Sequence, residues 1–362
     1  MTATAVRPEW GAVPDQVRAY IETRLGAAVA EAQMCGGGFT PGLAARLLLA
    51  DGNRVFVKGI ADEHPMASVY REEARITTAL PESAPGPRVF WTETSGQAAG
   101  WSLLCLEDLP DGNPDLSPGS SDVRAVVDAL LLMRESLTPS PIPEAPQMAD
   151  VHGSYLCGWA ELAEGAPADL DPWAVRNLGR LAGIEKGWLD AARGSTLTHG
   201  DLRPDNMVMS GGKAVVIDWS YLSQAADWCD GGSLVPHLIL AGHSPASAEA
   251  VVAPLLGLAD ADAVTSFAAA FGGYWERSSR NPAPPERAAP ARLPGACRRC
   301  RAGVDRAPHG LDVDRHTRSA PVPGPGRAAG AAAGRARPKW AGPVRLCAGC
   351  RQVATWARGR RR

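Results

Sequence analysis

The chain has 362 residues, of which 45% are hydrophobic and 21% are charged. This composition is typical of globular proteins, and the length is sufficient for two lobes with separate cores. No apolar run approaches the ~20 residues that a membrane-spanning helix requires. The first fifteen residues also lack the apolar stretch of a secretory signal. We therefore expect no membrane association and a cytoplasmic location.

Half of the eight cysteines are scattered through the first 280 residues, as free thiols in a reducing compartment usually are. These four are Cys35, Cys105, Cys157 and Cys229. Their spacing gives no sign of a disulfide framework, which agrees with the expected cytoplasmic location.

The net charge of −2 conceals two segments of opposite charge. Residues 281–362 contain 18 of the 37 basic residues and 4 of the 39 acidic ones, a net charge of +14. The other 280 residues therefore carry 19 basic and 35 acidic residues, a net charge of −16. A change this large at one point indicates two segments of different origin.

A glycine-rich loop that starts at Gly36 precedes a predicted β-hairpin. Alternating residues over 43–49 and an apolar run over 55–58 flank a turn at Asp51, Gly52 and Asn53. These turn residues are the ones that tight hairpin connections favour.

A helix and a further strand follow the hairpin. Residues 67–80 have a helical pattern that Pro81 ends, and residues 101–106 form an apolar run with the character of a strand. The order of hairpin, helix and strand predicts a small first lobe that is mostly β-structure.

Beyond this lobe the patterns are mainly helical, because apolar residues recur at helical spacing. Helices are expected over residues 122–137, 170–193, 246–256 and 261–276. Two short apolar runs, at 196–198 and 214–217, flank a turn at residues 210–212. Together with the first lobe, these elements predict an α+β fold.

The segment with the clearest chemistry reads H-G-D-L-R-P-D-N over residues 199–206 and is followed by V-I-D-W over residues 216–219. Phosphoryl transfer requires a carboxylate near the attacking hydroxyl and ligands for the magnesium that neutralises the phosphates. Asp201 and Asn206 are five residues apart, and Asp218 follows a short hairpin twelve residues later. This is the kinase order of base, metal-binding Asn, hairpin and metal-binding Asp.

Each of these residues alone has an ordinary explanation. A lone Asp at the end of a strand is usually a cap or a turn residue, and His-Gly-Asp also occurs in common loops. The complete pattern, with the hairpin between its two halves, favours catalysis over these explanations.

Residues 199–206 resemble the catalytic loop of the aminoglycoside phosphotransferase family, whose members include antibiotic and choline-type kinases. Residues 217–219 are similar to the metal site of that family, where protein kinases carry Asp-Phe-Gly. The His-Arg-Asp and Ala-Pro-Glu triplets of protein kinases are missing from the chain. The resemblance extends over about residues 30–280 and implies a two-lobed, protein-kinase-like fold with ATP and Mg²⁺ as cofactors.

The resemblance also implies roles for the residues of the catalytic loop. Asp201 would position and deprotonate the acceptor hydroxyl, and Asn206 and Asp218 would bind magnesium. Arg203 would stabilise the charge on the transferring phosphoryl oxygens. The alternative for Arg203 is a surface arginine that pairs with Asp205, and the sequence leaves both open.

In the first lobe, the resemblance implies residues that contact the nucleotide. Gly36, Gly37 and Gly38 resemble the nucleotide loop of the family, in which missing side chains let backbone N–H groups approach the phosphates. Residues 104–107 resemble the hinge, where backbone groups of Leu106 and Glu107 would bind the edge of the adenine.

Lys58 ends the second strand of the predicted hairpin, as the phosphate-pairing lysine of kinases does. The chain contains only four lysines, so one within an apolar strand is not easily explained as a solvated surface residue. Glu73, in the helix that follows, is the counterpart that would orient this lysine. Its neighbour Glu72 is the alternative candidate for this role.

The predicted organisation is an N-lobe over residues 1–107, a helical C-lobe over 108–280 and a tail over 281–362. The predicted function is transfer of the γ-phosphoryl group of ATP to a hydroxyl of a small molecule, such as an aminoglycoside, choline or another metabolite. We expect a monomer by default. The charge of −16 on the catalytic part would suit a cationic acceptor. The alternative is a catalytically inactive nucleotide-binding protein whose basic tail is an interaction arm.

Two acidic residues that follow the predicted metal site have two possible roles. Asp227 and Asp230 could face a cationic substrate, or they could hold the catalytic loop in place. We prefer the second interpretation, because acidic residues at this place more often have a structural role.

The tail contains two C-x-x-C pairs, over residues 297–300 and 347–350, with two histidines between them. A zinc site is one interpretation, but the 46 residues between the pairs exceed the spacing of about 15–20 in zinc ribbons. An arginine-rich nucleic-acid arm is a second interpretation, which we do not favour. In both cases the tail has too little apolar bulk to predict packed structure.

A third interpretation explains the composition of the tail best. A GC-rich gene that is read out of frame gives Arg, Ala, Gly and Pro, which dominate here. One permitted choice of codons for residues 286–296, shifted by one nucleotide, encodes a peptide similar to the start of the final helix in family members. We therefore prefer a frameshift near Pro285.

Overall fold

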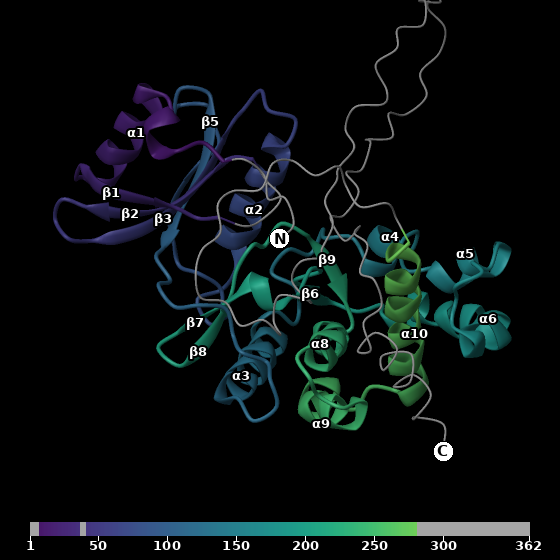
Figure 1. Ribbon diagram of the computed structural model, residues 1–362. Helices are drawn as coiled ribbons and strands as arrows, with labels where there is room; N and C mark the ends of the chain where they lie inside the picture. Colours follow the sequence, from purple (N-terminus) through teal and green to yellow (C-terminus); the bar gives the residue numbers. More distant parts are fainter. Residues whose placement is uncertain (1–6, 37–40, 281–362) are drawn as a thin grey trace, which may run out of the picture.

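The computed structural model describes residues 7–36 and 41–280, which form two lobes of different character (Figure 1). The N-terminal lobe contains a five-stranded antiparallel sheet, and the C-terminal lobe is mainly helical with two small sheets. The predicted α+β class and the two-lobed, kinase-like arrangement are confirmed. Within the described ranges, no helix has both the length and the apolar character needed to cross a membrane.

The sheet of the N-lobe has the strand order β1-β2-β3-β5-β4. Its strands are β1 (Val29–Met34), β2 (Leu43–Leu49), β3 (Arg54–Ala61), β4 (Val89–Glu93) and β5 (Trp101–Glu107). The predicted hairpin is confirmed, since β2 and β3 pair antiparallel across the turn at Asp51–Asn53. Strand β5 ends at Glu107, and we keep 107/108 as the predicted boundary between the lobes for this reason.

The two faces of this sheet have different neighbours. Side chains alternate between the faces of a strand, and Leu43, Ala45 and Leu47 of β2 pack with Val17 and Ile21 of α1 (Asp15–Leu25). A short 3₁₀ helix, η1 (Trp10–Ala12), precedes α1. The opposite face carries Lys58 and packs against α2 (Ala67–Ala79), the helix predicted over residues 67–80.

The C-lobe contains eight helices within the described residues. They are α3 (Ser121–Ser136), α4 (Met148–His152), α5 (Gly158–Glu164), α6 (Pro172–Glu185), α7 (Trp188–Ala191), α8 (Cys229–Leu240), α9 (Pro245–Leu256) and α10 (Ala261–Ser278). The helices predicted over 122–137, 246–256 and 261–276 are confirmed as α3, α9 and α10. Helices α3, α8, α9 and α10 contribute most of the large core of this lobe.

The single helix predicted over residues 170–193 is wrong, because the structure has two helices there, α6 and α7. The chain turns at Lys186 and Gly187, and Gly187 lies close to Ser266 of α10. The turn directs the indole of Trp188 into the core, where it packs edge-on against Phe267. Burial of this large side chain explains why the helix does not continue.

Two small sheets hold the segment that contains the H-G-D motif. Strand β6 (Thr196–Thr198) pairs with β9 (Ser223–Ala225), and β7 (Met207–Ser210) pairs with β8 (Lys213–Val216). The turn between β7 and β8 is confirmed, and Gly211 and Gly212 both have positive φ angles there. The two apolar runs that flank this turn, at 196–198 and 214–217, therefore belong to different sheets.

Candidate active site

Lys58 of β3 lies between two carboxylates that come from different lobes. Its Nζ is 2.5 Å from Glu73 Oε1 of α2 and 3.3 Å from Asp218 Oδ1, which follows β8. Burial lowers the pKa of Lys58, but the negative charges of Asp218 and Glu73 outweigh this effect, so the pKa lies above its usual value. The ammonium group is therefore charged, and it links the N-lobe to the C-lobe.

The structure places the two candidate partners of Lys58 differently. Glu73 is buried and contacts Lys58, whereas Glu72 pairs with Arg75, its Oε1 lying 2.8 Å from Arg75 Nη2 at the surface. Glu73 thus occupies the position that orients the lysine.

Asp201 and Asn206 lie together in the loop between β6 and β7, where the 3₁₀ helix η2 (Pro204–Asn206) brings Asn206 back toward Asp201. Asn206 Nδ2 donates to the backbone oxygen of Asp201 at 2.7 Å and is 3.3 Å from its Oδ2. Both side chains are buried. Because the amide nitrogen is directed at Asp201, the amide oxygen is the atom that can bind a cation.

The carboxyl group of Asp201 has an unusual proton affinity. Burial raises its pKa to about 7, while the charge of Arg203 lowers it and that of Asp218 raises it further. A carboxyl group with a pKa near neutrality can accept a proton from a substrate at physiological pH.

Arg203 lies near both of its predicted partners. Its Nη2 is 2.7 Å from Asp205 Oδ2, and its Nε is 3.7 Å from Asp201 Oδ1. The side chain is only 24% exposed. Arg203 is therefore a partly buried cation beside Asp201, and it also makes the pair with Asp205.

The buried side chain of His199 stabilises the loop that contains Asp201 through hydrogen bonds to the backbone. The backbone N–H of Asp201 lies 3.3 Å from His199 Nδ1, so Nδ1 is the acceptor and Nε2 carries the proton that is directed at the Ile217 carbonyl, 2.9 Å away. The ring also packs edge-on against Trp219. Burial lowers the pKa of His199, which keeps the ring neutral. One side chain thus joins the segment of Asp201 to the segment of Asp218.

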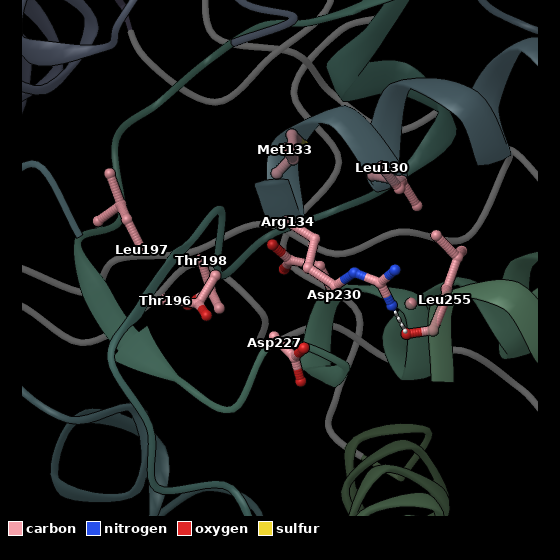
Figure 2. Close-up of a pocket in the computed structure, with 10 residues that line it drawn as sticks. Leu130, Met133, Arg134, Thr196, Leu197, Thr198, Asp227, Asp230 and Leu255 are labelled. Atoms are coloured by element: carbon pink, nitrogen blue, oxygen red, sulfur yellow. Dashed lines mark hydrogen bonds between the residues drawn. The ribbon is translucent and has the colours of Figure 1, made fainter. Parts of the chain in front are cut away.

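Asp230, near the start of α8, supports the same loop through hydrogen bonds to its backbone. Its carboxylate accepts the backbone N–H of His199 at 3.1 Å and that of Gly200. Burial raises the pKa of Asp230 to about 6, and these two backbone donors lower it. Figure 2 shows Asp230 and Asp227 beside Thr196 and Thr198 of β6, in a small hollow. The structural interpretation of Asp230 is therefore confirmed.

Those residues predicted to contact the nucleotide that the structure describes lie on or beside the sheet. Gly36 follows β1, while Gly37 and Gly38 lie outside the described residues. Leu106 is buried near the end of β5. The backbone N–H of Glu107 donates to the Arg88 carbonyl at 2.9 Å, so the sheet hydrogen bonding continues to the end of the strand.

Sequence reasoning missed three residues near this site. Phe56 stands two positions before Lys58 on the same face of β3, opposite Leu106, and the alternation of the strand could have identified it. Arg46 and Asp108 form a bidentate ion pair between β2 and the segment after β5. These two residues are 62 positions apart, and no local pattern connects them.

An apolar hollow lies beside the catalytic loop, on the side of Gly200. Burial lowers the pKa of His152, which lines it, to about 4, so this ring is neutral at physiological pH. None of the described residues that line the hollow is acidic. They are Met148, His152, Tyr155, Leu156, Gly200, Phe271 and Tyr274.

The described residues contain no group of three or more His, Cys, Asp or Glu side chains arranged to hold a metal ion. The possible zinc ligands of the tail lie outside the described residues. A cation at Asn206 and Asp218 would thus need further ligands from its substrate, as Mg²⁺ commonly takes from phosphates.

A charged lysine paired with a glutamate, a buried carboxylate and an Asn/Asp pair lie at the junction of the two lobes, an arrangement typical of kinase-like phosphotransferases. The model of the APH phosphotransferase enzyme family matches residues 43–270, which is more than half of the chain. The chain belongs to this family and is a phosphotransferase.

Three solved structures are similar to this chain. Choline kinase LicA from Streptococcus pneumoniae is 15% identical, with a TM-score of 0.50 over 72% of this chain and 87% of that one. A thermostable mutant of the aminoglycoside phosphotransferase APH(4)-Ia is 12% identical, with a TM-score of 0.48 over 72% and 91%. The macrolide 2'-phosphotransferase MphH from Brachybacterium faecium is 16% identical, with a TM-score of 0.47 over 70% and 87%. A search of curated proteins found no match.

Proposed function

We propose that this phosphotransferase uses ATP and Mg²⁺ and transfers the γ-phosphoryl group to a hydroxyl of a small molecule. The observation that carries the proposal is the meeting of Lys58, Glu73 and Asp218 at the junction of the lobes. This contact brings a cation suited to phosphates next to a carboxylate suited to magnesium. The buried pair of Asp201 and Asn206 lies nearby, since the charge of Asp218 acts on Asp201.

The residues present fit the proposed nucleotide and metal. Asn206, through its amide oxygen, and Asp218, through its carboxylate, would hold Mg²⁺, which neutralises charge on the phosphates when it is bound. Lys58 would bind the α- and β-phosphates, and backbone N–H groups of Gly36, Gly37 and Gly38 would approach the others. The base would lie along Phe56, Leu106 and Glu107, on the face of the sheet that carries Lys58.

Asp201 would act on the acceptor. Its carboxylate would accept a hydrogen bond from the acceptor hydroxyl and take the proton as the new O–P bond forms and the bond to the ADP oxygen breaks. Arg203, beside it, would stabilise the charge on the oxygens of the transferring group. The pKa of Asp201, about 7, suits this task near neutral pH.

The acceptor would enter from the side of Gly200, next to the apolar hollow. The described lining of this hollow offers aromatic and aliphatic surface and no carboxylate, so it gives no specific support for a cationic acceptor. The net charge of −16 on residues 1–280 gives only general attraction. A substrate screen should therefore include neutral hydroxylated molecules as well as aminoglycosides and choline.

The other expectations remain part of the proposal. The four cysteines in the described part of the chain are free thiols, which supports a reducing, cytoplasmic location. A monomer is the simplest assembly. The alternative of an inactive nucleotide-binding protein gains no support from the described residues, since Lys58, Asp201, Asn206 and Asp218 are all present and close together.

The test is nucleotide binding followed by turnover. ATP affinity, measured by titration calorimetry, should increase with magnesium, and Asp218→Ala should remove this increase. A screen of hydroxylated molecules should then reveal an acceptor that causes ADP release. Glu73→Gln should weaken ATP binding, while the matched variant Glu72→Gln should not. Nucleotide affinity that ignores both magnesium and Asp218→Ala would rule out the metal assignment.

A further inference from the structure

An ion pair joins β2 to the first residue after β5. Arg46 Nε is 2.6 Å from Asp108 Oδ1, and Arg46 Nη2 is 3.2 Å from Asp108 Oδ2. The side chain of Asp108 is 4% exposed and that of Arg46 is 20% exposed. Two parallel hydrogen bonds between a planar guanidinium and a carboxylate fix distance and angle together. The pair is therefore a rigid connection between two segments that are distant in sequence.

The register of the sheet places this pair on the face that carries Lys58. Arg46 is opposite Phe56, and Phe56 is opposite Leu106, so these three residues form one row across the strands. Lys58 belongs to the next such row, between Ala44 and Leu104. Successive rows on one face are about 7 Å apart. Arg46 thus lies close to the proposed phosphate site, on the side where the base would bind.

The pair also positions the segment that follows β5. The N–H of Glu107, the last residue of this strand, donates to the Arg88 carbonyl, and the chain leaves the sheet at Asp108. The carboxylate of Asp108 is held by Arg46 at this point. The position of the segment relative to Phe56 therefore depends on the ion pair.

We propose that Arg46 and Asp108 are positioning residues for the base of the nucleotide. They hold the segment after β5 against β2, so that its backbone meets the base at a set distance from Lys58. The inference rests on the proposed use of ATP. Neither side chain needs to contact the nucleotide, and the phosphate end of the site does not depend on them.

The test compares a ligand that has a base with one that has none. Dissociation constants for ATP and for tripolyphosphate, both with magnesium, are measured by titration calorimetry in wild type, Arg46→Met and Asp108→Asn. We expect ATP binding to weaken about tenfold in each variant and tripolyphosphate binding to stay within twofold. Arg46→Lys, which keeps the charge and loses the paired geometry, should weaken ATP binding by a smaller factor. The swapped double variant Arg46→Asp/Asp108→Arg should recover part of the loss.

Arg71→Met is the matched control, because it removes another ion pair of the N-lobe, with 3.2 Å between Arg71 Nη1 and Asp62 Oδ1. It should leave both dissociation constants unchanged. An equal loss of affinity for ATP and for tripolyphosphate in the Arg46 and Asp108 variants would overturn the inference. It would indicate that the ion pair only stabilises the N-lobe as a whole. Unchanged ATP binding in these variants would overturn it too, while the proposed function would stand. If the wild type does not bind ATP, whether or not it binds tripolyphosphate, the proposed function and this inference are both overturned.

Discussion

If Asp201 is the general base, as proposed, it is subject to opposite demands from folding and from chemistry. Its burial stabilises the protonated form and raises the pKa to about 7, whereas a general base must be able to lose its proton. The hydrogen bond from Asn206 and the nearby charge of Arg203 favour the ionised form. A buried carboxyl group with a strongly raised pKa destabilises the folded chain, and such groups are typical of functional sites.

The first prediction separates chemistry from binding at Asp201. Asp201→Asn keeps the shape and removes the base, so ATP affinity should be unchanged while the rate falls by about 10²–10⁴. Lys58→Ala should differ, because it removes a phosphate contact and should weaken ATP binding together with turnover. The measurements are ATP titration and ADP release with the acceptor that the screen identifies. Equal rates for Asp201→Asn and wild type would contradict the mechanism.

A second prediction concerns stability and needs no substrate. The pKa of Asp201 is about 7 in the folded chain and near 3.9 in an unfolded one. As pH rises between these values, the unfolded chain releases the proton first, so the stability of the wild type falls. Asp201→Asn lacks this loss and should be more stable above pH 7, by up to roughly 4 kcal/mol, since one pKa unit corresponds to about 1.4 kcal/mol.

Urea unfolding at pH 5 and pH 8 checks this prediction. The difference in unfolding free energy between Asp201→Asn and wild type should be larger at pH 8. A difference that is the same at both pH values would show that Asp201 is not a destabilising buried acid.

At the scale of elements, α10 packs closely on α5 through two glycines. A Cβ atom at Gly158 would lie 2.0 Å from the Gly273 carbonyl oxygen, and a Cβ at Gly273 would lie 2.6 Å from Trp159 Cδ1. Glu185 of α6 reaches the same place, where it accepts the backbone N–H groups of Trp159 and Ala160. Three helices therefore meet at a contact that leaves no room for a side chain.

Two neighbouring glycines of α10 provide the third prediction. Gly273→Ala should destabilise the protein by about 1–3 kcal/mol through overpacking against Trp159. Gly272→Ala places its Cβ in open space and should stabilise the helix by about 0.5–1 kcal/mol. Thermal or urea unfolding measures both. Similar effects of the two substitutions would contradict the close contact of α5 and α10.

The elements that the sequence predicted well are those with local signals. The hairpin of β2 and β3 has clear turn residues, and α3 and α10 have long apolar periodicity. Helix α8 was not predicted, because it is apolar on nearly all sides and contains Pro236. Burial in the core of the lobe stabilises it in spite of these features. Helix α1 and strand β1 were also missed, since their patterns are weak and their packing is tertiary.

The candidate site follows the same rule. Asp201, Asn206 and Asp218 were recognised because they lie within one short motif, and their roles remain predictions that the experiments above address. The support from Asp230 was the preferred interpretation of that residue, and its hydrogen bonds to the loop confirm it. The pair of Arg46 and Asp108 could not be found, because strand register alone brings these two residues together.

At the scale of the whole molecule, the site exists only where the lobes meet. Lys58 of β3 and Glu73 of α2 belong to the N-lobe, while Asp201, Asn206 and Asp218 belong to the C-lobe. A change in the angle between the lobes would therefore alter the distance of 3.3 Å between Lys58 and Asp218.

The tail, which lies outside the described residues, provides the fourth prediction. If residues beyond about Pro285 are read out of frame, the cysteines of the two C-x-x-C pairs should hold no stoichiometric zinc. Metal analysis of the purified chain measures this, and resequencing the gene around Pro285 is the direct check. One tightly held zinc per chain that Cys297→Ser abolishes would instead establish a genuine zinc site.

The contact between Lys58 and Asp218 has a consequence for the order of binding. Asp218 already has a cation beside it, a tethered ammonium group whose effective concentration is high. If Asp218 binds magnesium as proposed, a free magnesium ion would compete with this group, whereas the phosphates of ATP would pair with the ammonium and bring the metal with them. Binding is then an exchange of partners. Magnesium alone should leave the melting temperature unchanged, and magnesium with ATP should raise it. In Lys58→Met, where the internal competitor is gone, magnesium alone should become stabilising.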